Sequence, residues 1–385
     1  AFKPSENVLV LYPVKTSADK LSKMAVTSDG TKYRLNSDEY DDLHDKDKIS
    51  RTIRTEFNLG SRKQIGEYLK KFGWEPTKFT PTGQPMVDES VLKKIKGIPE
   101  ALLIAEYLTL QKRIAQIKSW LKNTDDEDRV HGFVNTNGTI TGRMTHREPN
   151  LAQVPNSNSP YGKECRACWT VPDDYKLVGI DASGLELRML AHYMDDEGFT
   201  NEILHGDIHT ANQKLAGLES RSQAKTFIYA FIYGAGDEKL GTVVGGGRAD
   251  GQRLKQSFLD NLPSLRNLKN RVTRAAAKGH IKGLDGRKIY IRSAHAALNS
   301  LLQGGGSIVM KEALCLLNGY IQDNNLDAHF VANIHDEWQI EVLEKDAKKV
   351  GELGVLAIQN AGLEFEMKCP LDGEYNIGAN WSETH

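Results

Sequence analysis

Asp181 is the residue whose surroundings first suggest metal chemistry. It ends the apolar run 177–180, which predicts a buried strand because no polar residue interrupts it. Gly184 and the Leu-Glu-Leu-Arg-Met-Leu pattern that follows it predict a helix. A carboxylate at the point where a strand leaves the core is held rigidly and faces outward, as a metal ligand must be. A lone aspartate here would more often cap the following helix, so its role depends on a partner.

The tripeptide His335-Asp336-Glu337 supplies that partner. It lies between two β-like runs, 329–334 and 338–343, so we expect it at the tip of a hairpin. Rigid carboxylates from distant segments can converge on divalent cations, and magnesium prefers a few carboxylate oxygens plus substrate phosphates. We therefore expect Asp181 and Asp336 to hold two Mg²⁺ ions about 3.5–4 Å apart, with Mn²⁺ as a substitute. Such ions would polarise an attacking hydroxyl and stabilise a leaving pyrophosphate.

A second set of residues indicates a phosphate-binding helix. Ser220 and Gln223 form a capping box that predicts a helix starting near Arg221, and Gly234 is suited to follow its end. Residues at every fourth position share one face, namely Arg221, Lys225, Tyr229 and Tyr233. Cations in the first turn oppose the helix dipole, and a broken local rule often marks function. They would help a helix N-terminus to bind a triphosphate, although a basic amphipathic surface helix has the same pattern.

Residues 281–306 predict a hairpin with Asp285-Gly286 at its turn, followed by a short helix. Three leucines of that helix are expected to face the core: Leu298, Leu301 and Leu302. Asn299 and Gln303 share its polar face. Side-chain amides can donate to minor-groove acceptors of both A·T and G·C pairs, which suits a protein that checks pair geometry without choosing sequence. The glycines at 304–306 permit close backbone approach.

The first third of the chain is less informative. The charged stretch 38–48 is expected to be an exposed loop, and helices are expected at 88–96 and 100–121. In the longer helix, apolar residues at coiled-coil-like spacing predict the face that packs on a neighbouring helix. These residues are Leu103, Tyr107, Leu110, Ile114, Ile117 and Leu121.

Composition limits the class of protein. With 385 residues the chain is long enough for two or three subdomains. Its net charge of −1 gives no bulk argument for nucleic-acid binding. Residues 269–292, however, carry eight basic side chains against Asp285 alone, which is typical of a phosphate-tracking surface or of a solvated face.

The cysteines and the termini bear on the compartment. Cys165 and Cys168 form a Cys-X-X-Cys without a second pair at zinc spacing, which favours a reduced intracellular protein. No apolar run is long enough to span a membrane. A start at Ala1 without a secretory signal indicates a fragment or a processed product.

Taken together, these motifs resemble those of family A DNA polymerases. DASGLELR (181–188) and HDE (335–337) are similar to the two palm motifs of the family. The RxxxKxxxYxxxYG pattern, preceded by GDIHT, is similar to its fingers helix, and TGR (141–143) and the final EYNIGANWSETH also have counterparts. Within the family the chain most resembles the replicative polymerases of T-seven-like phages, without their exonuclease domain. The resemblance runs from about residue 57 to His385.

The resemblance implies an α+β right-hand fold, with a helical thumb, a palm of antiparallel strands and helical fingers. The expected segments are 57–130 for the thumb, 131–200 and 281–385 for the palm, and 201–280 for the fingers. Residues 1–56 are an uncertain N-terminal segment. In the phage relatives the thumb carries an insertion that binds a processivity partner, and this segment is a candidate for part of such an insertion.

The resemblance also implies a role for each matching side chain. Asp181 and Asp336 hold the metal ions with the backbone carbonyl of Ala182, and Glu337 is a further catalytic carboxylate near the primer. The incoming nucleotide is contacted by Glu186, His209, Arg221, Lys225, Tyr229 and Tyr233. DNA is contacted by Arg143, Asn150, Gln153, Arg292, Asn299, Gln303 and His335. Glu186 leaves no room for a 2′-hydroxyl, the group that distinguishes ribonucleotides, and Tyr229 implies tolerance of nucleotides that lack a 3′-hydroxyl.

The function that follows is template-directed DNA synthesis at a primer 3′ end, without proofreading in this chain. The expected partners are primer–template DNA, deoxynucleoside triphosphates, and a processivity factor or a separate exonuclease chain, but no membrane. The expected location is intracellular, in the host cytoplasm for a viral source. Two alternatives remain open. One is a single-subunit RNA polymerase or primase, and the other is a non-catalytic polymerase-like subunit that binds DNA.

Overall fold

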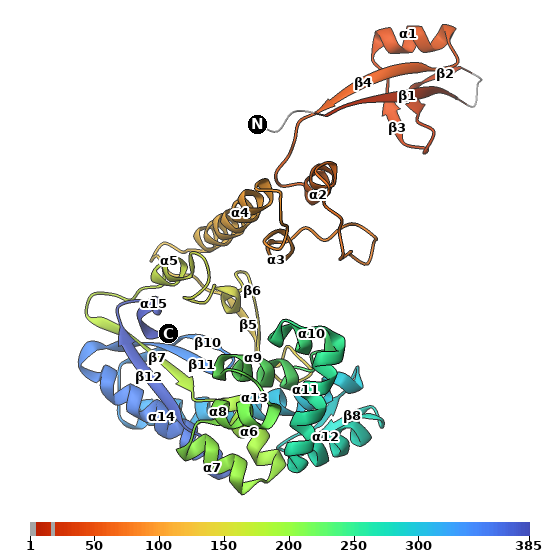
Figure 1. Cartoon of the computed structure of the whole chain (residues 1–385). Helices are drawn as coiled ribbons and strands as arrows, with labels where there is room; N and C mark the ends of the chain where they lie inside the picture. Colours follow the sequence, from red (N-terminus) through yellow and green to blue (C-terminus); the bar gives the residue numbers. More distant parts are fainter. Residues whose placement is uncertain (1–4, 17–19) are drawn as a thin grey trace. The chain divides into compact units, whose positions relative to one another are not determined.

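The computed structural model describes residues 5–16 and 20–385. The chain divides into two compact units, Ala1–Ile114 and Ala115–His385 (Figure 1). Helix α4 (Glu100–Lys122) runs across this boundary, which falls inside the segment 57–130 expected for the thumb. Within the described residues, no helix combines the length and the apolar character that crossing a membrane requires.

The first unit contains a small antiparallel sheet in the order β3-β2-β1-β4. Its strands are β1 (Ser5–Lys15), β2 (Leu21–Val26), β3 (Lys32–Arg34) and β4 (Ile49–Thr55). Helix α1 (Ser37–Asp45) contributes Leu43 to the core of this sheet. The expectation of a loop at 38–48 is therefore wrong, because a capping box of Asn36 and Glu39 starts a helix that Leu43 anchors. Residues 1–4 and 17–19 of the uncertain segment 1–56 lie outside the described residues.

Helices α2 (Arg62–Lys71), α3 (Glu89–Leu92) and the first part of α4 complete this unit. The helix expected at 88–96 is a single turn, whereas the helix expected at 100–121 is confirmed. The buried side of α4 carries Ala101, Ile104 and Ala105, while Leu103 and Leu121 of the expected stripe are 66% and 70% exposed. The expected packing face is therefore wrong. Apolar residues lie almost all around this helix, so spacing alone does not select a packing face. The face that packs on the core carries small alanines, which allow close packing.

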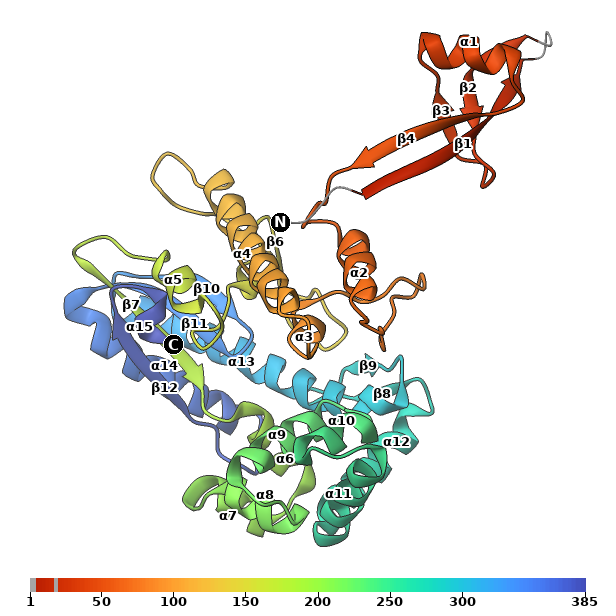
Figure 2. The same cartoon turned by 45° about the horizontal axis from the view of Figure 1, so that its top comes forward.

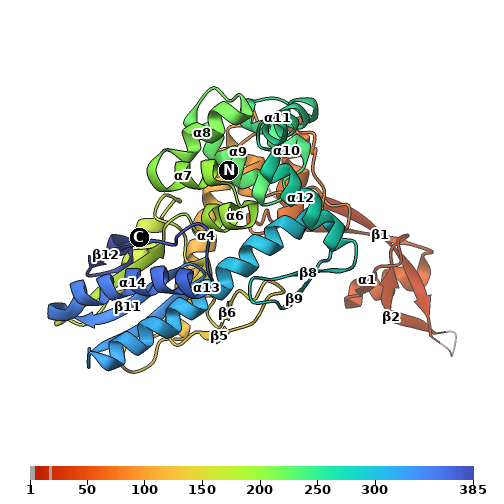
Figure 3. The same ribbon diagram turned by 90° about the horizontal axis from the view of Figure 1, so that it is seen from below.

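The second unit is built around an antiparallel sheet in the order β10-β11-β7-β12. Its strands are β7 (Tyr175–Ala182), β10 (Ala328–Ile334), β11 (Glu337–Leu343) and β12 (Gly373–Gly378). Ile180, Trp338 and Ile340 are buried on one face. Helix α14 (Ala347–Glu364) covers that face, with α13 (Ala297–Asp323) beside it, as Figure 3 shows. The strand at 177–180 and the expected hairpin are confirmed, as is the α+β class.

The other face of this sheet carries a polar row on β11, with Gln339 between Glu337 and Glu341. These three side chains are buried. Helices α5 (Gly162–Ala167) and α15 (Trp381–Thr384) lie on this side, α15 against β7 and β12. A buried polar row needs hydrogen-bond partners, and this requirement shapes the site described below.

A group of helices follows β7 in the chain, and Figure 2 shows α8, α9, α10 and α11 grouped together. The helices are α6 (Leu185–Met194), α7 (Glu197–His205), α8 (Ile208–Ala216), α9 (Arg221–Ile232), α10 (Asp237–Gly241), α11 (Arg248–Asn261) and α12 (Pro263–Ala276). Their core includes Phe227, Phe231 and Phe258, whose rings are 5.3–6.1 Å apart. The expected start and end of α9 are confirmed by the Ser220–Gln223 capping box and by a φ of +72° at Gly234.

Two hairpins and a long helix complete the unit. The hairpins are β5 (Phe133–Asn135) with β6 (Thr145–Arg147), and β8 (His280–Lys282) with β9 (Lys288–Tyr290). The hairpin expected around Asp285-Gly286 is confirmed. The helix after it is not short, because α13 runs for 27 residues and continues through the glycines at 304–306. Those glycines allow the expected close approach, since a Cβ on Gly305 would lie 2.8 Å from the sulfur of Met189.

Candidate active site

The two predicted carboxylates meet at one end of the sheet in the second unit. In the ladder between β7 and β11, Asp181 stands opposite Glu337. His335 and Asp336 form the two-residue turn before β11, and the backbone N–H of Ala182 donates to the carbonyl of Asp336 at 3.1 Å. His335 takes the left-handed φ of +63° that a tight hairpin turn requires. The chain thus brings together two acidic residues that are far apart in sequence.

Burial and neighbouring charge raise the pKa of Asp181 to about 8. Burial is the largest cause, followed by the negative charges of Asp336, Glu337 and Glu374. Glu374 lies on β12 directly opposite Asp181. It was not among the predicted site residues, because its sequence context is an ordinary exposed strand and only the register of β12 brings it here.

This concentration of carboxylates suits a divalent cation, whose charge would favour the ionised form of Asp181. Within residues 5–16 and 20–385, no group of three or more His, Cys, Asp or Glu side chains is arranged to hold a metal ion. A cation at Asp181 and Asp336 would therefore take further ligands from water or from the oxygens of a bound substrate, as Mg²⁺ commonly does.

The raised pKa gives a testable pH dependence for the metal-free protein. In the unfolded chain Asp181 would titrate near 3.8, but in the folded chain it does so near 8. The folded state therefore binds the proton more tightly, and its stability falls as pH rises from about 4 to about 8. We expect Asp181→Asn to remove a destabilisation on the order of a few kcal/mol at pH 8.5 but little at pH 4.5. Urea unfolding in EDTA at the two pH values measures this difference, and an equal effect at both would contradict the assignment.

Glu337 differs from its predicted environment. It lies within β11 rather than at the hairpin tip, and it is only 5% exposed. Its Oε1 accepts hydrogen bonds from Nε1 of Trp381 at 2.6 Å and from Nε2 of Gln339 at 2.7 Å. Nδ1 of His385 lies 3.2 Å from its Oε2. The expected position at the hairpin tip is therefore wrong for Glu337, because the row of buried polar groups on β11 engages it.

Glu186 connects the sheet to helix α9. The left-handed Gly184 starts α6 and places Glu186 in its first turn. The hydroxyl of Tyr233 donates to Oε1 of Glu186 at 2.6 Å, and Nη2 of Arg143 lies 3.4 Å from the same oxygen. The pKa of Tyr229 is raised by burial and by Glu186, Asp336 and Asp181. The predicted stripe on α9 therefore reaches the carboxylates.

The other end of the stripe carries cations. Arg221 and Lys225 are exposed, while Ala224 and Phe227 of the same helix are buried. His209 on α8 lies beside this stripe, with its ring 6.2 Å from that of Tyr229. Among the described residues, no group bonds to its buried Nδ1. Burial and the charges of Arg221 and Lys225 lower the pKa of His209.

Asp207 also belongs to this site, although it was not among the predicted site residues. Its position shortly before His209 was the only signal in the sequence. It caps α8 by accepting from the backbone N–H of His209 at 3.1 Å and from the hydroxyl of Thr210 at 2.7 Å. It also accepts from Nε of Arg221 at 2.7 Å. These bonds lower the pKa of Asp207, with Arg221 as the largest cause. In the described part of the chain, Nη1 and Nη2 of Arg221 make no hydrogen bond, so they remain available to an anion.

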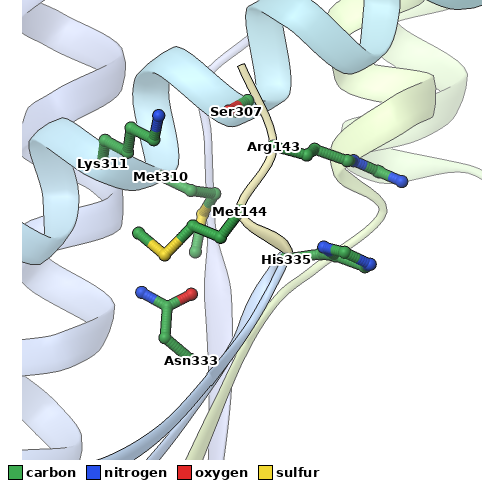
Figure 4. Close-up of a pocket in the computed structure, with 7 residues that line it drawn as sticks. All are labelled: Arg143, Met144, Ser307, Met310, Lys311, Asn333 and His335. Atoms are coloured by element: carbon green, nitrogen blue, oxygen red, sulfur yellow. The ribbon is translucent and has the colours of Figure 1, made fainter. Parts of the chain in front are cut away.

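The residues predicted to contact DNA lie on several different elements. Figure 4 shows Arg143 and His335 beside one pocket, with both side chains extending away from Lys311. Nζ of Lys311 donates to the carbonyl of Gly142 at 2.6 Å, which fixes the loop that carries Arg143. Burial and the charge of Arg143 lower the pKa of His335.

The remaining predicted contacts lie on other elements. Asn150 precedes the short helix η1 (Leu151–Gln153), which contains Gln153, and its side chain makes no capping hydrogen bond to this helix. Asn299 and Gln303 are half-buried on α13, and Arg292 is exposed between β9 and η3 (Ala294–Ala296). The described contacts include no hydrogen bond from these five side chains to Asp181 or Asp336.

Comparison with known proteins agrees with this geometry. Residues 34–383 match DNA polymerase family A. The chain belongs to this family. It is 43% identical over 371 residues to the DNA-directed DNA polymerase of Enterobacteria phage T3, and 41% identical to that of Escherichia phage T7. Each alignment covers 86% of this chain and 53% of the phage protein, so the chain spans about half the length of these family A relatives.

A solved structure supports the same fold. The POL domain of Pol1 from M. smegmatis matches with a TM-score of 0.77 at 24% identity, over 86% of this chain and 62% of that one. The right-hand fold of family A expected from the motifs is therefore confirmed.

Proposed function

We propose that this chain is a DNA-directed DNA polymerase, which adds deoxynucleotides to a primer 3′ end with the help of two Mg²⁺ ions. The observation that carries the proposal is the meeting of Asp181 and Asp336 beside the stripe of Arg221, Lys225 and Tyr229. The two carboxylates suit cations, and the basic side chains of the stripe suit a triphosphate. These two sets of groups lie at the two ends of one site. Family membership and the two phage polymerases support the same activity.

The carboxylates of Asp181 and Asp336 and the carbonyl of Ala182 would hold the metal ions. When bound, such ions activate a hydroxyl and stabilise a departing pyrophosphate. Phosphoryl transfer depends mainly on positioning and charge stabilisation, and the remaining residues supply both. Arg221 and Lys225 bind the triphosphate through charge-assisted hydrogen bonds, with His209 donating beside them. The rings of Tyr229 and Tyr233 face the sugar and base.

Selection of the sugar and contact with DNA fall to other residues. Glu186, held by Tyr233 and Arg143, occupies the space that a 2′-hydroxyl would need. Arg143 and His335 would contact the primer end. Asn150 and Gln153 would also lie near the primer, and Arg292 would contact the DNA backbone. Asn299 and Gln303 would donate to minor-groove acceptors that all base pairs share.

The proposed partners are primer–template DNA and deoxynucleoside triphosphates, the ligands with which the M. smegmatis POL domain was solved. A processivity factor is a further proposed partner, with residues 1–56 as the candidate segment. The strands β1–β4 of this segment pack around a core of their own: Leu11, Ala25, Leu35, Leu43 and Ile49. These partners imply action inside a cell, where both DNA and nucleotides are found.

Primer extension tests the proposal directly. Four templates that differ in the first unpaired base are offered, with Mg²⁺, each deoxynucleotide and each ribonucleotide in turn. We expect each template to direct the complementary nucleotide. Preferred use of ribonucleotides would favour an RNA polymerase or primase, and tight DNA binding without extension would favour a non-catalytic subunit. Extension from a mispaired primer without prior removal of the mismatch is expected if the chain does not proofread.

Asp207→Asn separates positioning from charge at the triphosphate. Removing the carboxylate raises the positive potential near Arg221, which by itself would strengthen nucleotide binding. Because Asp207 orients Arg221 through Nε and leaves both terminal nitrogens to the phosphates, we instead expect the KM for deoxynucleotide to rise about fivefold. Steady-state single-nucleotide extension measures this change. Asp196→Asn is the matched control, since Asp196 caps α7 in the same way without touching Arg221. A lower KM for Asp207→Asn would contradict the positioning role.

A further inference from the structure

The segment formed by α15 and His385 grips Glu337 from the side of the sheet opposite α14. Two N–H groups converge on Oε1 of Glu337: Nε1 of Trp381 at 2.6 Å and Nε2 of Gln339 at 2.7 Å. Nδ1 of His385 lies 3.2 Å from Oε2. Both carboxylate oxygens are therefore engaged, and a carboxylate held in this way has little freedom to turn toward another ligand.

Trp381 is itself fixed. Its side chain is 3% exposed and packs with Trp120, Val154, Cys165 and Leu177. The guanidinium of the buried Arg166 lies 4.7 Å over its ring. Its backbone N–H donates to the carbonyl of Trp169 at 3.0 Å. The indole N–H that reaches Glu337 is thus mounted on a rigid support.

Strand β7 is adapted to receive this segment. A Cβ on Gly179 would lie 2.5 Å from the backbone oxygen of Thr384 and 2.6 Å from Nε2 of Gln339, so only glycine fits there. The hydroxyl of Thr384 donates to Oε1 of Gln339 at 2.7 Å, which aims the amide nitrogen of Gln339 at Glu337. Gly179 lies two residues before Asp181 on the same face of the strand. The segment therefore rests on the strand that presents a metal-binding carboxylate.

We propose that Trp381 is a positioning residue that acts through Glu337 on the site formed by Asp181 and Asp336. Glu337 pairs with Asp181 across the ladder and directly follows Asp336. Fixing its carboxylate fixes the start of β11, and with it the turn that carries Asp336. Glu337 then acts as an anchored charge beside the metal-binding pair rather than as a metal ligand. This inference rests on the proposed polymerase function.

Trp381→Phe tests the proposal, because it keeps an aromatic ring and removes only the N–H donor. Trp169→Phe is the matched control: Trp169 belongs to the same cluster, with its ring 5.1 Å from that of Trp120, but in the described chain its buried Nε1 has no hydrogen-bond partner. We expect Trp381→Phe to lower the single-turnover rate of nucleotide addition about tenfold, with an unchanged apparent Kd for deoxynucleotide. Trp169→Phe should leave both values as in the wild type.

A spectroscopic readout is independent of activity. The chain has five tryptophans, and ¹⁵N-labelled indole groups give one N–H resonance each. We expect the resonance that disappears in Trp381→Phe to lie downfield in the wild type and to move in Glu337→Gln. The double variant Trp381→Phe/Glu337→Gln should be no slower than Glu337→Gln alone, because both changes break one interaction. If Trp381→Phe does not fold, His385→Ala provides the same comparison at Oε2, with a smaller expected loss of rate.

Several results would overturn the inference. One is a wild-type rate in Trp381→Phe, and another is an equal loss of rate in Trp169→Phe. The others are a loss confined to nucleotide affinity and an indole N–H resonance that does not move in Glu337→Gln. A wild-type chain that adds no nucleotide would instead overturn the proposed function, and the positioning role with it. A normal wild-type rate with unaffected variants overturns the positioning role alone.

Discussion

Replacing Asp181 or Asp336 by asparagine is expected to lower the single-turnover rate of nucleotide addition by about 1,000-fold or more. Each change removes a charged ligand from the proposed pair of ions, and metal stabilisation of transition-state charge supplies several kcal/mol. Glu337→Gln is expected to lower this rate only about tenfold, because the Glu337 carboxylate is engaged in hydrogen bonds from Trp381 and Gln339 rather than in metal binding. Rapid-quench extension of a primer by one nucleotide at saturating Mg²⁺ measures all three variants.

Glu374→Gln is the control for charge. It removes a negative charge next to Asp181, opposite it on β12, without removing a proposed ligand. We expect its rate to stay within about threefold of the wild type. Comparable rates for Asp181→Asn and the wild type would contradict the metal-binding assignment. So would a loss in Glu374→Gln as large as that in Asp181→Asn, because charge alone would then explain the effect.

Glu186→Ala is expected to reduce discrimination against ribonucleotides by about 100-fold. The side chain of Glu186 is only 12% exposed, and Tyr233 and Arg143 hold it in place. Truncation would open the space that we propose Glu186 denies to a 2′-hydroxyl. Such discrimination is a difference between two affinities for the transition state. The ratio of kcat/KM for each deoxynucleotide to that for the matching ribonucleotide measures the effect.

Two further variants make that prediction sharper. Glu186→Gln keeps the volume of the side chain and should retain most of the discrimination. Tyr233→Phe removes the hydroxyl that donates to Glu186 at 2.6 Å and should give an intermediate loss. Unchanged sugar preference in Glu186→Ala would favour the reading of the chain as an RNA polymerase or primase.

The parts of the site that could be predicted from sequence depend on local patterns. The apolar run before Asp181 indicated strand β7, and alternation after Glu337 indicated β11. The four-residue spacing on α9 placed Arg221 and Lys225 on one face, because helical periodicity is a property of the segment itself. The family resemblance then ordered these elements into one fold.

Residues whose role depends on register or on distant contacts could not be predicted in the same way. Glu374 faces Asp181 only because β12 pairs with β7 in one alignment. Trp381 reaches Glu337 across 44 positions of sequence. The burial of Glu337 depends on the helix α15 that covers its face of the sheet. No local pattern distinguishes these side chains from ordinary strand or terminal residues.

Local composition also misled where packing decided the outcome. The charged segment 38–48 contributes most of α1, because Leu43 and the partly buried Tyr40 pack this helix on the core of the small sheet. The glycines at 304–306 usually weaken a helix, but here they lie within α13, where side chains of α6 and β9 pack closely against them. In both places tertiary contacts outweighed intrinsic propensity.

The central claim is that Asp181 and Asp336 together bind two cations beside a nucleotide. The most direct test is anomalous scattering from Mn²⁺ in crystals of the chain with a dideoxy-terminated primer–template and the next complementary deoxynucleotide. We expect two peaks about 3.5–4 Å apart, both within bonding distance of the two carboxylates or the triphosphate. A bound nucleotide with no peak between Asp181 and Asp336 would contradict the account.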